Sequence, residues 1–245
     1  MPIPIPYDPT LWGFPINVHL VLEYAAFIVG YRYYVYLKQR SADRISSGNR
    51  STIIIGAALG ALIGSRVFGW LEHPAGLVGA DFMTIMNAKT IMGGLFGGLV
   101  GVEWTKKLIG EKESSGDLFT FPIILGLIIG RVGCFLSGVN EFTYGSPTAS
   151  LFGMDLGDGV LRHPIALYEI VFLVALFWFL RVLQRRRADL PSGALFQYFM
   201  VAYFGFRFGI EFLKPNEFFV LGLSSIQYLC LVCLGYYGKV MLIDK

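Results

Sequence analysis

Charged residues are scarce in this chain, because Asp, Glu, Lys and Arg make up 15% of its 245 residues. A soluble domain carries about 25% charged residues, so the composition argues against a soluble fold. Hydrophobic residues make up 55% of the sequence, and the mean hydropathy is +0.60. The sequence also lacks a long polar stretch from which a second domain could form. We therefore expect a single membrane-embedded domain over residues 1–245.

Basic residues are missing from the start of the chain, where residues 1–15 hold five prolines and no Lys or Arg. A signal peptide has a basic region followed by an apolar run, so we expect the first hydrophobic helix to direct insertion itself. Cysteine is scarce too, and Cys134, Cys230 and Cys233 all fall in apolar runs. In a membrane helix, the pair Cys230 and Cys233 is interpreted as packing rather than redox chemistry. No metal, cofactor or nucleic-acid partner is expected.

Seven stretches are long and apolar enough to cross roughly 30 Å of hydrocarbon. They lie near Asn17–Leu37, Thr52–Leu71, Lys89–Leu108, Leu118–Gly138, Ile165–Leu183, Ala194–Leu213 and Leu221–Gly238. The predicted fold class is therefore all-α, a polytopic membrane protein of about seven transmembrane helices. Glycines recur every four residues in the second and third stretches, a spacing that lets membrane helices approach closely. These glycines are Gly56, Gly60 and Gly64, and Gly93, Gly97 and Gly101.

The basic residues between these stretches predict the orientation. Thirteen of the 20 Lys and Arg residues lie at the odd-numbered connections, at the helix ends beside them and at the C-terminus. The N-terminus and the even-numbered connections hold only Lys89, Arg162 and Lys214. Because Lys and Arg are enriched on the cytoplasmic side, we expect the N-terminus outside and the C-terminus in the cytoplasm. The long fourth connection, residues 139–164, then lies outside. Its hydrophobic side chains predict an ordered, functional loop rather than a disordered one.

Three arginines, Arg66, Arg131 and Arg207, lie far inside the predicted helices. At 1.5 Å per residue each is roughly 20 Å from the cytoplasmic end of its helix, in the outer half of the membrane. Buried charge is expensive in lipid, so these side chains should face a cavity and meet anions there. Arg207 and Glu211 are spaced i, i+4 and share a helix face. Further polar groups occupy the outer parts of other helices, namely Glu23, His163, Tyr168 and Glu169.

Two interpretations of these arginines remain open. One is a purely structural network of ion pairs. The other is a site for an anionic ligand, which the excess of cationic groups favours, and guanidinium groups bind phosphate well. A cavity at this depth that opens sideways would meet phospholipid headgroups of the outer leaflet.

The sequence resembles the bacterial prolipoprotein diacylglyceryl transferase family over nearly its whole length. The residues that carry the resemblance are segments 130–138 (GRVGCFLSG), 163–169 (HPIALYE), 206–215 (FRFGIEFLKP) and 64–66 (GSR). The resemblance implies transfer of the diacylglyceryl group of phosphatidylglycerol, an anionic phospholipid, to the lipobox cysteine thiol in a prolipoprotein signal peptide. The resemblance also implies that glycerol phosphate leaves and that the reaction takes place in the bacterial inner membrane.

The resemblance also assigns roles to residues. Arg131 and Arg207 would stabilise the phosphate leaving group as catalytic residues, with Glu211 orienting Arg207. The substrate-binding residues would be Arg66, Tyr168, Glu169, Gly133 and Gly138.

The departures from the family pattern affect the side of the site that activates the thiol. Met92 precedes Gly93-Gly94-Leu95 where the family has a histidine, and methionine cannot take a proton from a thiol. Cys134 and Ser137 replace asparagines, and Val139 replaces an acidic residue, two positions before Glu141. His163 is a candidate catalytic base, although a histidine before proline can also be a structural hydrogen-bonding residue.

Two functions besides the leading one remain open. The first is a homologous transferase with a different acceptor. The second is a phospholipid- or anion-binding membrane protein or transporter without catalysis; a transporter would usually show related halves with broken helices, and no convincing internal repeat is visible.

Overall fold

The computed structural model describes residues 5–41, 43–72, 74, 79–82, 85, 88–187, 189–216 and 219–243. The chain divides into two compact units. The first comprises residues 1–42, 116–199 and 212–215, and the second comprises residues 43–115, 200–211 and 216–245. The single domain expected over residues 1–245 stays a prediction.

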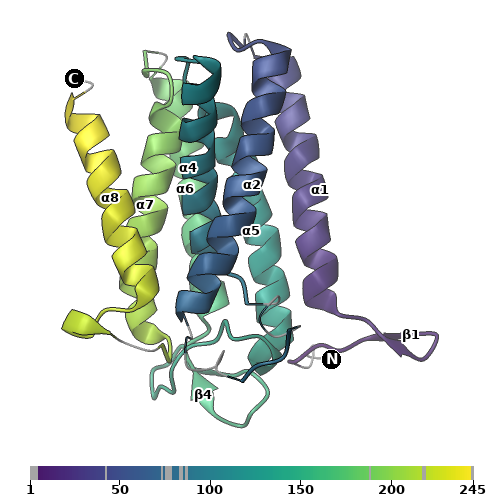
Figure 1. Ribbon diagram of the computed structural model, residues 1–245. Helices are drawn as coiled ribbons and strands as arrows, with labels where there is room; N and C mark the ends of the chain where they lie inside the picture. Colours follow the sequence, from purple (N-terminus) through teal and green to yellow (C-terminus); the bar gives the residue numbers. More distant parts are fainter. Residues whose placement is uncertain are drawn as a thin grey trace. The chain divides into compact units, whose positions relative to one another are not determined.

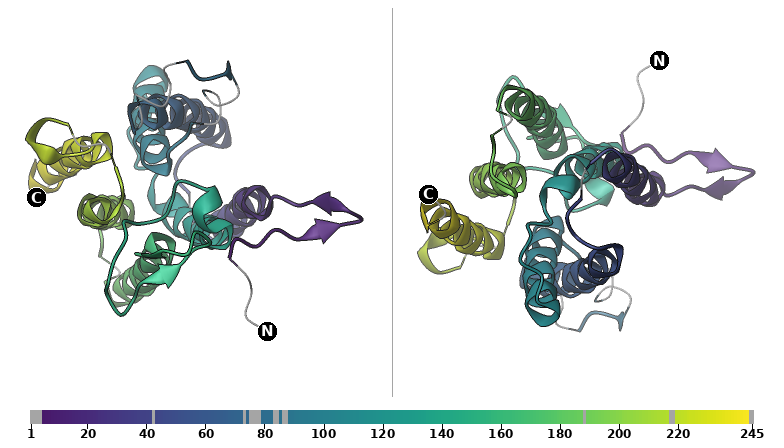
Figure 2. Two further views of the ribbon diagram at one scale, coloured as in Figure 1. Left: turned by 90° about the horizontal axis from the view of Figure 1, so that it is seen from below. Right: turned by 90° about the horizontal axis from the view of Figure 1, so that it is seen from above.

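The first unit is built on three long helices, α1 (Val18–Gln39), α5 (Asp117–Ser137) and α6 (Ile165–Arg186). Helix α5 packs against both α1 and α6 (Figure 1). Asn17 caps α1, because its side-chain oxygen accepts a hydrogen bond from the Leu20 amide at 2.9 Å. Ahead of α1, strands β1 (Thr10–Leu11) and β2 (Phe14–Pro15) form a short antiparallel hairpin that projects away from the helices of this unit (Figure 2).

The connection between α5 and α6 is ordered, as the sequence predicted. It contains the short helix η2 (Gly138–Asn140) and the antiparallel strands β3 (Met154–Asp155) and β4 (Leu161–Arg162). Leu156 is buried, and its carbonyl accepts the amide of Val139 at 3.1 Å, which anchors the loop to the end of α5.

The second unit contains α2 (Ser47–Glu72), α4 (Ile91–Ile109), η4 (Val220–Gly222) and α8 (Ser225–Ile243). Helices α2 and α4 pack along each other, and both contact α8. The predicted glycine spacing is confirmed as the contact between α2 and α4. A Cβ atom built on Gly60 would lie 2.2 Å from the carbonyl oxygen of Gly97, and one on Gly64 would lie 2.3 Å from that of Gly93.

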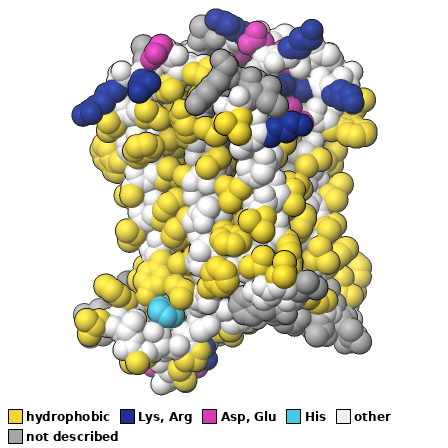
Figure 3. Space-filling model, turned by 90° about the vertical axis from the view of Figure 1, so that its left-hand side faces the viewer, with side chains coloured by type: hydrophobic (Ala, Val, Ile, Leu, Met, Phe, Trp, Pro, Cys, Tyr) yellow, Lys and Arg dark blue, Asp and Glu magenta, His cyan; other side chains and the backbone are white. Residues whose placement is uncertain are grey.

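Helix α7 (Ala194–Ile210) belongs to the first unit up to Phe199 and to the second unit from Met200, and η3 (Glu211–Leu213) follows it. Each of the seven predicted stretches thus contains a long helix. Among the described residues, four of these helices are long and apolar enough to span a membrane: α2, α5 with η2, α6 and α8. Hydrophobic side chains cover much of the face drawn in Figure 3. The chain is therefore a helical, multi-pass membrane protein.

Candidate functional site

Arg131 lies in the last third of α5 and is buried in the first unit. Its Nε atom is 2.8 Å from Oε1 of Glu169 on α6, whose carboxylate is fully buried. The structure thus brings together two residues that the sequence assigned to the site from different helices. An ion pair of this kind orients the planar guanidinium, which is the group suited to bidentate binding of phosphate.

The thiol of Cys134 lies next to this ion pair, one helical turn after Arg131. Arg131 Nη1 is 3.6 Å from Cys134 Sγ, and on the other side Sγ is 3.9 Å from Nε2 of His19, at the start of α1. The second ring nitrogen, Nδ1, is 2.8 Å from Oε1 of Glu141, in the loop after η2. Five polar side chains therefore form a continuous chain of contacts, in the order Glu141, His19, Cys134, Arg131 and Glu169.

His19 is not among the residues that the sequence predicted for the site. The available signal was weak, because a single histidine at the start of an apolar helix is not a motif. Its contact with α5 depends on Gly133. A Cβ atom there would lie 3.3 Å from both Cα and Cδ2 of His19 and 3.2 Å from Cβ of Leu22. Gly133, predicted to bind substrate, is thus the residue that lets α1 approach α5 at this point.

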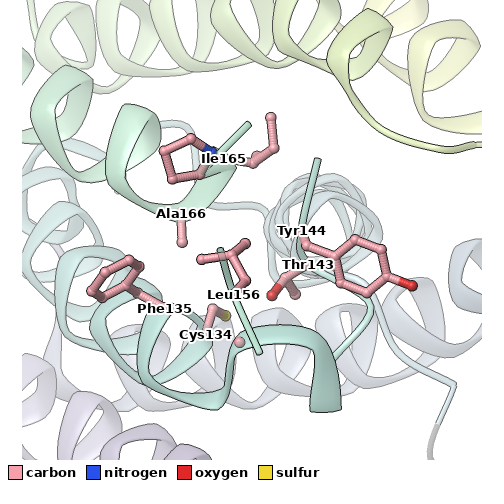
Figure 4. A pocket seen from close by; sticks show the side chains of 9 residues that line it. Cys134, Phe135, Thr143, Tyr144, Leu156, Ile165 and Ala166 are labelled. Carbon is pink, nitrogen blue, oxygen red and sulfur yellow. The ribbon is translucent and has the colours of Figure 1, made fainter. Parts of the chain in front are cut away.

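Gly138 ends α5 with φ of +52°, a conformation that other residues rarely adopt. A Cβ atom at this position would lie 2.2 Å from the carbonyl oxygen of Leu156. Gly138 is therefore required for the loop to close over the end of the helix. Between them lies a small pocket (Figure 4), in which Cys134 lies beside Leu156. The pocket is lined by Cys134, Phe135, Gly138, Thr143, Tyr144, Leu156, Pro164, Ile165 and Ala166.

His163 and Tyr168, both predicted site residues, contact each other at the start of α6. Nδ1 of His163 is 3.2 Å from the Tyr168 hydroxyl. The backbone of His163 donates to the carbonyl of Ser146 and accepts from the amide of Gly145, which joins it to the long loop. His163 therefore also has the structural role that the sequence analysis left open as the alternative.

The loop carries an ion pair of its own, between Asp158 and Arg162, just before His163 in the sequence. Arg162 Nε donates to Asp158 Oδ2 at 2.8 Å, and this hydrogen bond holds the pKa of the Asp158 carboxyl below its ordinary value. The same bond raises the pKa of Arg162. The pair fastens the turn between β3 and β4 and is partly exposed, so we assign it no part in the site.

In the second unit, Arg207 and Glu211 form the ion pair that their spacing predicted. Arg207 Nη2 is 2.8 Å from Glu211 Oε2, and both side chains are buried. Glu211 Oε1 also accepts a hydrogen bond from Asn216 Nδ2 at 2.7 Å. The carboxylate thus orients the guanidinium while it is itself held in place by an amide.

Arg66 and Met92 also belong to the second unit. Arg66 is half-buried on α2, with Nη1 3.5 Å from the carbonyl oxygen of Ala88. Met92 is fully buried at the start of α4. Among the described residues, no group of three or more His, Cys, Asp or Glu side chains is placed to hold a metal ion.

Comparison with known proteins identifies the family. Residues 9–243 match the family model described as prolipoprotein diacylglyceryl transferase. The chain belongs to this family. It is 33% identical over 196 residues to a protein of Nitratidesulfovibrio vulgaris, an alignment that covers 74% of this chain and 70% of that protein. A relative from Bordetella parapertussis is 31% identical over 210 residues, with 76% and 77% covered. Both relatives are named phosphatidylglycerol–prolipoprotein diacylglyceryl transferase.

A third relative of the same name, from Dehalococcoides mccartyi, is 28% identical over 197 residues and is covered over 73% of its length. Membership of the transferase family confirms the resemblance that four short segments had indicated. It also draws attention to Met92 and Cys134, where the sequence departs from the pattern that the resemblance predicted. In this member of the family, a cysteine in contact with a histidine stands where an asparagine was expected.

Proposed function

We propose that this chain is a diacylglyceryl transferase that acts on phosphatidylglycerol and on the lipobox cysteine of prolipoproteins. The acceptor sulfur attacks the glyceryl carbon that carries the phosphate, and a thioether bond forms. The bond between that carbon and the phosphate oxygen breaks, and glycerol phosphate leaves with the electron pair. The family membership supports the reaction, and the arginines support the way in which it is catalysed.

The observation that carries the mechanism is the buried ion pair of Arg131 and Glu169. Glu169 Oε1 lies 2.8 Å from Nε, and the attraction between the opposite charges holds the guanidinium at this place. The Nη atoms would donate to the phosphate oxygens, on which negative charge accumulates as the carbon–oxygen bond breaks. Hydrogen-bond donors that are oriented in advance, away from water, stabilise such charge better than mobile solvent.

Five further predicted residues support this role from their own positions. Arg207, held by Glu211, is the second candidate for the phosphate, and Arg66 is a candidate for the headgroup. Gly133 and Gly138 act by allowing close approach of His19 and of the Leu156 carbonyl, respectively.

The topology belongs to the same proposal. Seven helices cross the inner membrane of a bacterium, with the N-terminus outside and the C-terminus in the cytoplasm. The asymmetry of thirteen to three basic residues supports this orientation. With this orientation the loop between α5 and α6 lies on the outer side, where prolipoproteins and outer-leaflet phosphatidylglycerol meet. The row of contacting polar side chains from Glu141 to Glu169 lies on the same side.

A second candidate, a transferase with a different acceptor, is favoured by one observation. Met92 stands at the family's histidine position and is fully buried, so that position supplies no base for a thiol.

Complementation of a bacterial strain depleted of its own prolipoprotein transferase tests the proposal. We expect growth and lipidated lipoproteins from the wild-type chain and from neither Arg131→Ala nor Arg207→Ala, at matched membrane levels. Purified protein in phosphatidylglycerol vesicles should transfer the diacylglyceryl group to a lipobox peptide. If the vesicles release glycerol phosphate but no lipobox peptide is modified, the lipid half of the proposal stands and the acceptor is wrong.

A further inference from the structure

The transfer reaction requires a group that takes the proton of the acceptor thiol. A free cysteine thiol has a pKa of about 8.5, so only a few per cent is ionised at pH 7, and the thiolate is the nucleophile. That group must also lie close to the phosphate site, because the sulfur attacks the carbon next to the phosphate. Met92 has no basic atom, and His163, whose Nδ1 contacts the Tyr168 hydroxyl, is the alternative base that the sequence predicted.

His19 has the required position in the first unit. Its Nε2 is separated from the guanidinium of Arg131 by a single sulfur atom, through contacts of 3.9 and 3.6 Å. The thiol of Cys134 occupies the position between them, so the acceptor sulfur reaches Nε2 only where the Cys134 side chain turns aside. The side chain of His19 is 16% exposed, in contrast to the fully buried carboxylate of Glu169.

Glu141 determines which nitrogen of the ring can accept a proton. Its carboxylate lies 2.8 Å from Nδ1, so Nδ1 is the nitrogen that donates a hydrogen to it. In the neutral ring, which carries no second hydrogen, Nε2 then presents its lone pair toward the sulfur. A base held by a carboxylate and facing a thiol is the arrangement that activates sulfur nucleophiles in other enzymes. The charged and titratable groups around the ring are Glu141 from the loop, Cys134 and Arg131 from α5, and, through Arg131, Glu169 from α6.

We propose that His19 is the catalytic base for the acceptor thiol in this chain and that Glu141 is its positioning residue. The inference rests on the proposed transfer reaction. In the step, Nε2 takes the proton of the acceptor S–H, and the sulfur forms its bond to the glyceryl carbon. The carbon–oxygen bond to the phosphate breaks, glycerol phosphate leaves toward Arg131, and the imidazolium formed is stabilised by the carboxylate of Glu141.

The test compares two lipobox peptides, one with cysteine and one with selenocysteine, in phosphatidylglycerol vesicles that contain the purified protein. A selenol is already ionised at neutral pH and needs no base. General base catalysis contributes about 100-fold or more, so kcat of His19→Gln should fall by at least that factor with the cysteine peptide at pH 7. With the selenocysteine peptide, kcat of His19→Gln should fall less than tenfold. With the cysteine peptide, the difference in kcat between His19→Gln and wild type should become smaller as the pH rises toward 9.

Tyr24→Phe, at an exposed position on the same helix, is the matched control and should behave as wild type with both peptides. Glu141→Gln should show the same selectivity for the cysteine peptide as His19→Gln, with a smaller loss. Equal losses of His19→Gln with both peptides would mean a structural role and would overturn the inference. Wild-type rates for His19→Gln with the cysteine peptide would also overturn it. A wild-type protein that modifies neither peptide would instead overturn the proposed function and, with it, the role of His19.

Discussion

The contact between α2 and α4 predicts different effects for the same substitution at two adjacent glycines. Gly97 faces α2, and a Cβ atom there would lie 2.2 Å from the carbonyl oxygen of Gly60 and 2.9 Å from Cα of Gly64. Gly98, the next residue along α4, has room, because its Cβ atom would meet Ala57 O and Ala61 Cβ at 3.5 and 3.6 Å. We therefore expect Gly97→Ala to destabilise the protein and Gly98→Ala to be tolerated.

The size of the difference follows from the geometry. Both atoms closest to the new Cβ at position 97 are backbone atoms, so no side-chain rotation can relieve the clash and the helices must separate. Overpacking of this kind costs roughly 1–3 kcal/mol. The gain in helix propensity from Gly to Ala applies to both positions and cancels in the comparison. The two variants should therefore differ by about 1–3 kcal/mol, roughly 5- to 150-fold in the unfolding equilibrium.

Unfolding of the detergent-solubilised protein by increasing SDS, followed by tryptophan fluorescence or circular dichroism, measures this difference. The wild-type protein and Gly98→Ala should unfold at similar SDS fractions, and Gly97→Ala at a clearly lower one. Equal midpoints for the two variants would show that α2 and α4 are not in backbone contact at this position.

Three further predictions concern the first unit and the topology. Arg131→Lys should reduce diacylglyceryl transfer by at least 100-fold at normal membrane levels, because lysine loses the planar pair of donors; transfer near the wild-type rate would exclude the phosphate role. Gly138→Ala should destabilise the loop, since its Cβ would lie 2.2 Å from the Leu156 carbonyl oxygen, and limited proteolysis should then cut the loop faster than in wild type. Topology reporters fused at Arg186 and Gly157 should report the cytoplasm and the outside, respectively; reports from the same side would mean that the number of crossings is wrong.

The length of the hydrophobic stretches predicted the helices well, because each helix depends on a local property of the sequence. The last helix, α8, shows where such a prediction fails. The apolar run begins at Leu221, but α8 begins at Ser225, because Leu221 has φ of +61°, outside the helical region. Hydropathy does not register a backbone conformation of that kind.

The candidate site also contains contacts that the sequence could predict and contacts that it could not. The pair Arg207–Glu211 follows from spacing along one helix and could be predicted. The contact of His19 with Cys134 and Glu141 joins three segments that are distant in sequence, and it depends on the missing side chain of Gly133. No local pattern encodes such a contact, so the sequence did not point to His19, whereas His163 stands in a recognisable motif and stays a prediction.

The pair Arg207–Glu211 also permits a test between the two interpretations left open by the sequence, a structural network and an anion site. Breaking a buried ion pair by neutralising one partner costs about 3–5 kcal/mol, whereas replacing both partners by apolar residues is often close to neutral. Glu211→Leu should therefore lower stability markedly, and the double variant Arg207→Met with Glu211→Leu should recover most of the loss.

The two interpretations diverge for activity. If the pair is only structural, transfer should return together with stability in the double variant. We expect stability to return while transfer stays at least 100-fold below wild type, because methionine cannot bind phosphate. SDS unfolding and transfer to a lipobox peptide, measured on the same preparations of the two variants and the wild type, separate the outcomes. Transfer in the double variant close to the wild-type rate would assign Arg207 to the fold and would leave Arg131 as the phosphate-binding arginine among the residues proposed here.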